Sequence, residues 1–271
     1  GILKAKTEMI DYMNPEGTVI MNGDDDKLRG FTPQNGLSPV YFGLDASCPY
    51  HAEQITSRGL KGTDAHFVTP SSSFDAHISI PGSHMVYNAL AATAVGYALD
   101  MTDEEIAAGI KANVPIAGRN NLIEGSHYTV IDDCYNANPA SMKSSLDVLA
   151  YADTRTVAIL GDMFELGPKE KEMHYNVGQH AAEKGINVLI CIGDLSAEIA
   201  KGAEAGKTSA AGQSDAADSI NMEIHYYKTK ADFFKNADTV LNDGDTILVK
   251  ASHGMEFPEI VDKLIVEKQT S

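Results

Sequence analysis

The sequence predicts an α/β protein whose larger, second part folds around a parallel, doubly wound sheet. From residue 139 onward, amphipathic segments of helical period alternate with short apolar runs, as in sheets that are buried between two layers of helices. The apolar runs also end in polar residues, which in such sheets gather at the edge where ligands bind. With 271 residues, 43% of them hydrophobic, the chain is long enough for two domains with cores of their own.

The first 116 residues lack this alternation, and we expect a smaller, mixed domain there. Turns rich in Gly, Ser and Pro separate its short apolar runs. Thr102 and Glu105 form a capping box that marks the start of its last helix. The elements expected are a helix over 3–12, strands near 17–22, 39–43, 65–69 and 75–80, and helices over 85–100 and 102–113.

The second part begins near residues 116–118, and we divide the chain into domains 1–116 and 117–271. Asn138 is placed to cap a helix whose first residue is Pro139. The low-complexity stretch GKTSAAGQSDAADS (206–219) is expected to be a mobile loop. The elements expected are two strands within 122–133 joined by a Gly-Ser turn, helices over 139–151, 169–184, 196–204, 229–237 and 256–267, and strands over 155–162, 187–194, 223–227 and 245–252.

The chain is acidic, with 21 basic and 38 acidic residues and a formal charge of −17. Because it would repel phosphate backbones and anionic lipids, we expect neither nucleic acid nor a membrane surface as a partner. No apolar run approaches the roughly 20 residues of a membrane span, and from the opening residues we expect no signal peptide. Cys48, Cys134 and Cys191 are far apart and fit free thiols in a reducing cytoplasm.

One segment, KGAEAGKTSA (201–210), imitates a phosphate-binding loop. Such a loop needs Gly, four residues and then Gly-Lys-Ser/Thr, directly between a strand and a helix. Gly202 is one residue too close to Gly206, and the segment follows a helix. We therefore expect it to bind no phosphate.

The stretch IDDCYNANPASM (131–142) crowds polar side chains at a strand end. Asp132 and Asp133 are neighbours on a strand and point to opposite faces, so we expect one to face a ligand and the other to be structural. Helix capping explains Asn138 and Pro139 but leaves Tyr135, Asn136 and the two acids unexplained.

Two other strand ends allow two interpretations each. In GDMFELG (161–167), Asp162 and Glu165 either cap an ordinary turn or hold an amine or amide substrate. In VKASHGMEF (249–257), Lys250 and His253 either bind a carboxylate or phosphate or are a solvated lysine and a surface histidine. The remaining histidines show no ligand spacing, and we expect no dedicated metal cage.

Five blocks, in order and over nearly the whole chain, resemble the Mur ligases. They are PGSHMVYNALAATAVGYAL, AGRNNLIEG…YTVIDDCYNANPASMKSSLDVL, ILGDMFELG, HYNVGQHAAEKGINVLICIG and ILVKASHGM. The family has an N-terminal UDP-substrate domain, a central ATPase domain and a C-terminal Rossmann-like domain. The resemblance implies that residues 1–116 are the C-terminal part of the ATPase domain, and that residues 117–271 are the doubly wound C-terminal domain.

The blocks resemble most the members that add D-alanyl-D-alanine to UDP-N-acetylmuramoyl-tripeptide. The resemblance implies ATP and Mg²⁺ as cofactors, an acyl-phosphate intermediate, a cytoplasmic location and a monomer. The family's phosphate loop, of the form GTxGKT, does not occur in this sequence. We therefore expect this chain not to catalyse ligation by itself.

The resemblance also implies roles for particular residues. Lys6 resembles a lysine that is carbamylated to support a second Mg²⁺, and Asp133 the acid that binds the ATP ribose. Asn88 and Arg119 resemble contacts on the adenine and phosphate sides. The full set implied is Asn22, Asp24, Asn88, Arg119, Asp133, Tyr135, Asn136 and Asn138 for ATP, Lys6 and Lys250 for catalysis, and Asp162, Ser252 and His253 for substrate.

Three positions depart from the family's pattern, and two rival functions remain. Met85 stands where relatives often have Asn, Cys134 where they have Ser, and His253 where they have Arg; histidine is the weaker, pH-dependent anion partner. One rival is a related ligase of the folylpolyglutamate or cyanophycin synthetase type, which DDCYNANP and GDMFELG argue against. The other is a nucleotide-binding or docking module without catalysis.

Overall fold

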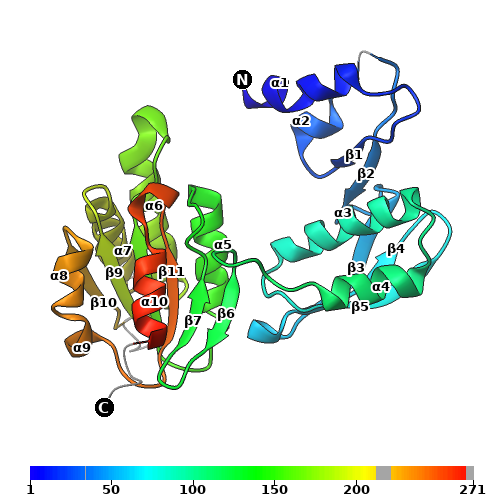
Figure 1. Ribbon diagram of the computed structural model, residues 1–271. Helices are drawn as coiled ribbons and strands as arrows, with labels where there is room; N and C mark the ends of the chain where they lie inside the picture. The colour runs from blue at the N-terminus through cyan, green and yellow to red at the C-terminus, as the bar shows by residue number, and fades with distance from the viewer. Residues whose placement is uncertain (34, 212–220, 267–271) are drawn as a thin grey trace. The chain divides into compact units, whose positions relative to one another are not determined.

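The computed structural model describes residues 1–33, 35–211 and 221–266. It divides into two compact units, Gly1–Val114 and Pro115–Ser271, which we call unit 1 and unit 2 (Figure 1). Each unit has a hydrophobic core of its own. No helix in the described ranges is long and apolar enough to cross a membrane.

Unit 1 is built on a five-stranded sheet of order β1-β2-β3-β4-β5. The first three strands run parallel, whereas β4 is antiparallel to both of its neighbours. The elements are α1 (Ile2–Thr7), η1 (Glu8–Tyr12), β1 (Ile20–Asn22), α2 (Asp26–Arg29), β2 (Val40–Gly43), β3 (Tyr50–Ser57), η2 (Gly59–Lys61), β4 (Thr63–Val68), β5 (Ser73–Ile78), α3 (His84–Ala98) and α4 (Asp103–Ala112).

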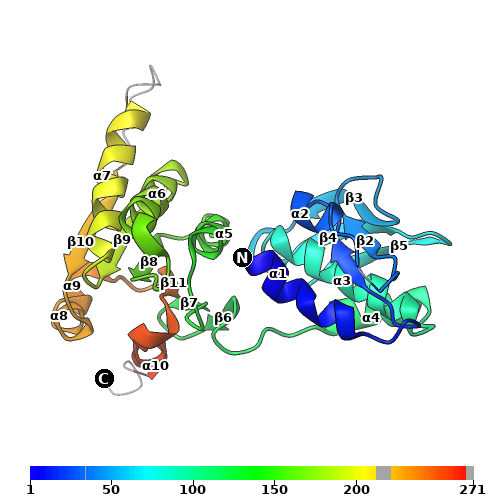
Figure 2. The ribbon, with the colours of Figure 1, turned by 90° about the horizontal axis from the view of Figure 1, so that it is seen from above.

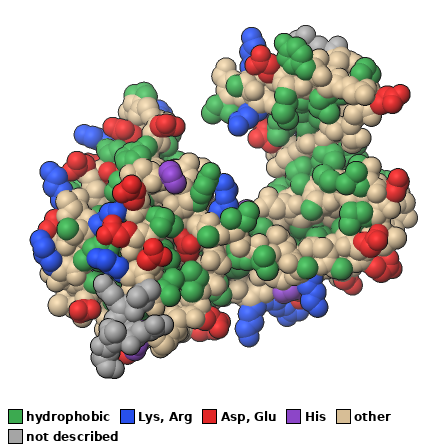
Figure 3. Space-filling view, in the orientation of Figure 1, with side chains coloured by type: hydrophobic (Ala, Val, Ile, Leu, Met, Phe, Trp, Pro, Cys, Tyr) green, Lys and Arg blue, Asp and Glu red, His purple; other side chains and the backbone are tan. Residues whose placement is uncertain are grey.

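Alternation along β4 and β5 gives the sheet of unit 1 one apolar and one polar face. Phe67 and Ile78 point to the apolar face, where they pack with Leu90 of α3 and Ile106 of α4. The predicted capping box of α4 is present, since Thr102 accepts from the Glu105 N–H and Glu105 accepts from the Thr102 N–H. Figure 3 shows hydrophobic side chains gathered over α3 and α4.

The sequence prediction missed β3. Of its eight residues, YHAEQITS, only Ala52 is buried, so hydrophobicity does not alternate along it. Its register with β4 also shifts between Glu53 and Thr56, and Gln54 has a positive φ of 50°. A bulge of this kind breaks the period of two on which strand prediction depends.

Unit 2 is the predicted doubly wound fold. Its six strands have the order β10-β9-β8-β11-β7-β6 and are parallel except for β6. Helices α5, α6 and α7 cover one face, and α8, α9 and α10 the other (Figure 2). The elements are β6 (Asn121–Glu124), β7 (Thr129–Asp132), α5 (Pro139–Leu149), β8 (Thr156–Gly161), η3 (Gly167–Lys169), α6 (Glu170–Glu183), β9 (Val188–Ile192), α7 (Ser196–Ala211), β10 (Glu223–Tyr227), α8 (Lys230–Phe234), α9 (Ala237–Val240), β11 (Thr246–Lys250), η4 (His253–Met255) and α10 (Pro258–Val266).

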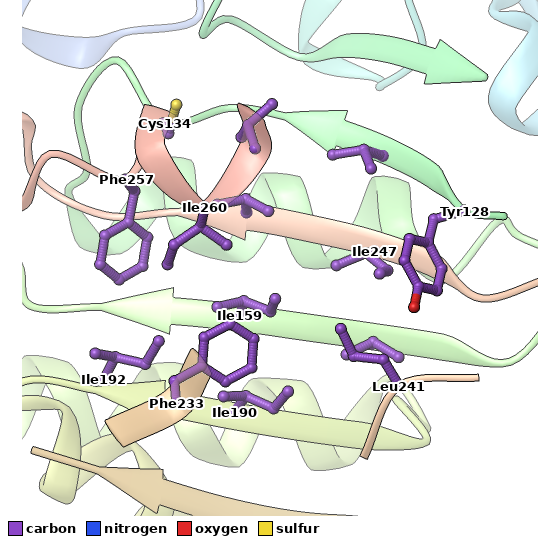
Figure 4. Packing of buried hydrophobic residues seen from close by; sticks show 14 of the residues in the cluster. Tyr128, Cys134, Ile159, Ile190, Ile192, Phe233, Leu241, Ile247, Phe257 and Ile260 are labelled. Carbon is purple, nitrogen blue, oxygen red and sulfur yellow. The ribbon is translucent and has the colours of Figure 1, made fainter. Parts of the chain in front are cut away.

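The central strands of unit 2 are buried on both sides, as their uninterrupted apolar runs predict. Every residue of β8, β9 and β11 is buried. Figure 4 shows one of the two packed layers, in which Ile159 and Ile190 of the sheet meet Phe233 of α8 and Ile260 of α10. The two helical layers leave the strand ends as the exposed edges where side chains can meet a ligand.

Two predicted elements of unit 2 end differently. The helix expected over 196–204 continues to Ala211, so residues 206–211 are helical rather than loop; residues 212–219 lie outside the described ranges. The helix expected over 229–237 is two short ones, α8 and α9. Asn236 donates its side-chain amide to the Asp232 carbonyl at 2.8 Å, and such local bonds compete with continuation of a helix.

The segment that imitates a phosphate loop lies inside α7, where its glycines serve helix packing. A Cβ at Gly202 would come within 1.9 Å of the Tyr175 carbonyl oxygen, and one at Gly178 of α6 within 1.9 Å of the Ile199 carbonyl oxygen. The two helices therefore meet backbone to backbone at these glycines.

Candidate functional site

The candidate site lies at the carboxyl ends of the strands of unit 2. Strand β11 pairs with β7 on one side and with β8 on the other. Residues that follow these three strands therefore meet at one edge, although they are far apart in sequence. Asp133 follows β7, Asp162 follows β8, and Lys250 closes β11.

Lys250 is buried, with 2% of its surface exposed. Its ammonium donates to Asp133 Oδ2 at 2.6 Å, to the Asp133 carbonyl at 3.2 Å and to the Asn136 carbonyl at 3.1 Å. The interpretation of Lys250 as a solvated lysine is thus wrong. All three bonds hold the turn that follows β7, so Lys250 fixes the shape of that turn.

Asp133 is the centre of this network. Besides Lys250, its Oδ2 accepts from the Ser145 hydroxyl of α5 at 2.5 Å, and its Oδ1 accepts from the Asn120 N–H at 3.0 Å. A carboxylate oxygen has two acceptor positions, so Oδ1 retains one for a ligand hydroxyl. The side chain is 16% exposed, so part of it is within reach of solvent.

Asp132 has structural partners on the other face. Its carboxylate accepts from the Gly118 N–H and from the Cys134 thiol, both at 2.8 Å. Burial, together with this carboxylate, raises the pKa of the Cys134 thiol. Gly118 has a φ of 76°, and a Cβ there would come within 3.2 Å of the Tyr135 N atom, so glycine is required at this turn.

Three planar side chains form an exposed group beside this network. The Arg119 guanidinium lies 4.1 Å from the centroid of the Tyr135 ring, and the His253 ring centroid lies 5.9 Å from that of Tyr135. Tyr135 is 51% exposed. The group offers an aromatic ring flanked by a cation and an imidazole, which suits a flat or anionic ligand.

Asn136 and Asn138 make local bonds within the same turn. The Asn136 side chain accepts from the Ala137 N–H at 2.9 Å. Asn138 caps α5, as predicted, and accepts from the Ser141 N–H at 2.9 Å. Capping thus accounts for Asn138, whereas Asn136 is an exposed residue whose side-chain oxygen holds the turn.

Asp162 lies at the same edge but is used within the protein. Its Oδ1 accepts from the N–H and the hydroxyl of Ser196 at 2.7 and 2.6 Å, at the start of α7. Its carbonyl accepts from the Ser252 N–H at 3.0 Å. Asp162 therefore caps α7, not the helix that directly follows it in sequence.

The loop after β8 is held by two further side chains. The Ser252 hydroxyl accepts from the Phe164 N–H at 2.8 Å. His174 of α6 is fully buried, and its Nε2 accepts from the Met163 N–H at 2.9 Å. Since Nε2 accepts, Nδ1 carries the proton and donates to the Glu170 carbonyl at 2.7 Å.

The candidates in unit 1 form a separate set. Asn22 accepts from the Asp24 N–H at 2.9 Å. Asp24 accepts from the Leu44 N–H at 2.6 Å and from the Tyr87 hydroxyl at 2.9 Å, and burial with this carboxylate raises the pKa of Tyr87 to about 12. Lys6 is exposed on α1.

Asn88 lies at a cavity in unit 1. The cavity, about 440 Å³ in volume, lies between α3 and α4, and Met85, Ala92 and Ile106 also line it. The Asn88 amide contacts the Met85 sulfur at 3.3 Å, so the residue that departs from the family's pattern adjoins the one implied for adenine.

Several residues of the network could not be found from sequence. Asn120 reaches Asp133 from 13 positions away because β6 pairs with β7, and Ser145 reaches it from 12 positions away on α5, the helix that follows β7. His174 carried a weak signal, because it stands at the start of the HYNVG block that entered the resemblance without a role.

Fold and strand-edge geometry define an α/β protein of two units, whose doubly wound unit carries an acid, a lysine and an asparagine turn at the carboxyl ends of its strands. The family model for the Mur ligase middle domain matches residues 1–96, and that for the Mur ligase, glutamate ligase domain matches residues 118–253. The chain belongs to the Mur ligase family.

Two curated relatives with the same name illustrate the similarity. A UDP-N-acetylmuramoyl-tripeptide–D-alanyl-D-alanine ligase of Bacillus subtilis strain 168 is 31% identical over 270 residues, which are 98% of this chain and 55% of that enzyme. The ligase of that name in Escherichia coli K12 is 31% identical over 209 residues, 76% of this chain and 46% of that enzyme. The chain thus spans about half the length of these relatives.

Solved structures give the same result for the fold. The MurF of Acinetobacter baumannii superposes with a TM-score of 0.81 at 25% identity, over 98% of this chain and 55% of that one. The MurF ligase of Thermotoga maritima in complex with ADP has a TM-score of 0.76 at 21% identity, over 99% and 58% of the two chains.

Proposed function

We propose that this chain is part of an ATP-dependent ligase that adds D-alanyl-D-alanine to UDP-N-acetylmuramoyl-tripeptide in the cytoplasm, as a monomer. The observation that carries the proposal is the 31% identity to the Bacillus subtilis ligase over 98% of the chain. ATP would convert the tripeptide carboxylate to an acyl phosphate, and the amine of the dipeptide would then attack it. Such catalysis depends on positioning and on neutralising charge.

The nucleotide side of the proposal rests on the Asp133 network. Asp133 Oδ1 retains an acceptor position for a ribose hydroxyl, and Tyr135 with Arg119 offers a surface for the rest of the nucleotide. Lys250 acts here as a positioning residue, because its three hydrogen bonds go to the turn at 133–136. It orients Asp133 and neutralises its charge in a partly buried setting.

The acyl-phosphate side rests on the loop after β8 and the end of β11. Ser252 and His253 adjoin each other there, and the Ser252 hydroxyl, which accepts from Phe164, can still donate to an anion. Asp162 supports this side indirectly, since its carboxylate holds the start of α7 and its carbonyl holds Ser252.

Mg²⁺ is part of the proposal only because the resemblance to the Mur ligases implies it. Among the described residues, no group of three or more His, Cys, Asp or Glu side chains could hold a metal ion, and Lys6 is exposed rather than directed into a carboxylate cluster. Mg²⁺ is therefore proposed without a site assigned to it among the described residues.

Nucleotide binding is best tested by changing the ligand instead of the protein, because substitution of Asp133 also breaks its bond to Lys250. We expect ATP to shift the NMR signals of the turn at 133–136, and 2′,3′-dideoxy-ATP to bind several-fold more weakly, since it lacks the hydroxyls that Asp133 would accept. Equal affinity for both, or no shift at millimolar ATP, would contradict the proposal.

Turnover is the second test, and it separates ligase from docking module. Because no GTxGKT sequence occurs in the 271 residues, we propose that the chain alone binds nucleotide without catalysing ligation. An assay with ATP, Mg²⁺ and both substrates should show no sustained release of ADP. Sustained release would refute this proposal, whereas absence of any nucleotide binding would favour the docking module.

A further inference from the structure

The polar face of the sheet in unit 1 carries two histidine–aspartate pairs that sequence spacing does not reveal. In the register of β4 and β5, Asp64 lies opposite His77, and His66 lies opposite Asp75. His77 Nδ1 lies 2.6 Å from Asp64 Oδ1, and His66 Nδ1 lies 2.8 Å from Asp75 Oδ1. The two histidines are thus diagonal to each other across the strand pair, and so are the two aspartates.

The pairing fixes the proton on each imidazole. An ionised carboxylate can only accept, so in both histidines Nδ1 carries the hydrogen, and neutral imidazole then has its lone pair on Nε2. Metal-binding histidines are oriented in the same way, by donating their other ring N–H to a carboxylate or carbonyl. His66 and His77 therefore have the tautomer that a metal ion requires.

The two imidazoles are also close enough to share a ligand. They stand on adjacent antiparallel strands at diagonal positions, whose Cα atoms are about 7–8 Å apart, within reach of long side chains. Both are partly exposed, at 27% and 34% of their side chains. Together with Gln54 and the two aspartates they line a hollow of about 390 Å³.

The surrounding charges favour a cation without supplying more ligands. Both oxygens of Asp64 are engaged, since Oδ2 accepts from Arg58 at 2.6 Å, so Asp64 orients His77 and does not itself face a metal. Asp75 is 89% exposed, and Glu53 of β3 lies opposite His66 on its other side. Asp64 and Asp75 line the hollow, with Arg58 beside Asp64 and with Glu53 next to His66 and paired with His51, so carboxylates outnumber the guanidinium around it.

We propose that His66 and His77 bind one divalent transition-metal ion, such as Ni²⁺, Cu²⁺ or Zn²⁺, through their Nε2 atoms. Imidazole suits these ions, and water would complete the coordination. Since the described residues include no group of three ligating side chains, we expect a site of modest affinity. It is independent of the ligase function proposed above.

Calorimetric titration of the whole chain with NiCl₂ and with ZnCl₂ tests the site. We expect one equivalent to bind near neutral pH, with affinity at least tenfold lower in His66→Gln and in His77→Gln. The matched control is His127→Gln, because His127 also pairs with an aspartate, Asp243, at 3.2 Å. It should bind as the unchanged chain does.

A second measurement needs no variant. Cu²⁺ is paramagnetic, and at one equivalent we expect it to broaden first the NMR signals of residues 64–66 and 75–77.

A further variant tests the role of the carboxylates. Asp75→Asn leaves both ligands in place but removes the carboxylate behind His66, and it should lower the affinity for the metal about tenfold or more. Absence of binding, broadening centred elsewhere, or equal loss in His127→Gln would overturn the proposal.

Discussion

Lys250 illustrates how one residue of the site could be located from sequence while its role could not. The position, at the polar end of an apolar strand, predicts a place at the ligand edge. The partner could not be predicted, because Asp133 is 117 positions away. Removing only one partner of a buried lysine–carboxylate pair strongly destabilises the folded state, because the other partner remains as a buried charge without a counter-charge.

Replacement of Lys250 by methionine should therefore destabilise unit 2. We expect the free energy of unfolding to fall by about 3 kcal/mol, because the Asp133 carboxylate keeps its burial and loses its counter-charge. Urea unfolding, followed through hydrogen exchange of amides in β8, measures the effect. Adding Asp133→Asn should restore part of the loss by removing the stranded charge.

The matched control is a lysine pair on the surface. Lys228 lies 3.8 Å from Asp194, and both side chains are more than 70% exposed. Such pairs contribute little, so Lys228→Met should change the free energy of unfolding by less than about 0.5 kcal/mol. A Lys250→Met variant as stable as this control would show that the buried pair carries no such cost.

The buried thiols of unit 2 predict a loss of stability at alkaline pH. Burial raises the pKa of Cys134 and of Cys191 above the ordinary value of 9.0. A raised pKa means that the folded state holds the proton more tightly, so the stabilisation is complete below 9.0 and declines as pH rises above it. As pH rises from 8 to 10, the free energy of unfolding should fall by about 1.4 kcal/mol for each thiol.

Comparison with a variant isolates the thiol from other groups that titrate in this range. In Cys191→Ala the decrease in the free energy of unfolding between pH 8 and pH 10 should be smaller than in the unchanged chain, by about that amount. Alkylation by iodoacetamide gives a second measurement, since both thiols should react only after unfolding. Identical pH dependence of the two proteins would refute the assignment.

At the scale of elements, the contact between α6 and α7 depends on the absence of side chains. Gly178 and Gly202 each lie where a Cβ would overlap a carbonyl oxygen of the other helix. Glycine is unfavourable inside a helix by roughly 1 kcal/mol relative to alanine. Close backbone packing must outweigh that loss for the helices to retain these residues.

Substitution of Gly202 by alanine should therefore destabilise the chain despite alanine's higher helix propensity. We expect a net loss of about 2 kcal/mol, since overpacking forces the helices apart. Gly109→Ala in α4 is the control, because a Cβ there meets no atom within 4 Å; it should gain about 0.5–1 kcal/mol. Thermal unfolding of both variants tests this contrast. A change of the same sign in the two free energies of unfolding would contradict it.

Element prediction succeeded where local chemistry decides and failed where tertiary contacts decide. The caps at Thr102 and Asn138 are local, and both are present. Strand β3 was missed because its bulge and polar residues remove the alternating pattern. The end of α7 was placed too early because Gly206, read as a loop residue, in fact packs against Ala182 of α6.

At the scale of the whole molecule, the alternating pattern was sufficient for the doubly wound fold of unit 2. The resemblance was sufficient for the family, because its motifs lie in the turns after strands. Partners of the site residues could not be predicted in the same way. Lys250 reaches Asp133 only through strand order, because β11, the last described strand in sequence, lies between β7 and β8.

The central place of β11 has a consequence for synthesis on the ribosome. The polypeptide emerges from its N-terminus, so Asp133 and its turn are made long before Lys250. Until β11 enters between β7 and β8, the two neighbouring strands have no partner at that position, and the turn lacks its buried cation. A nascent chain that stops short of residue 250 therefore lacks the buried cation that holds the turn at 133–136, and the turn can reach its final form only after translation has passed Lys250.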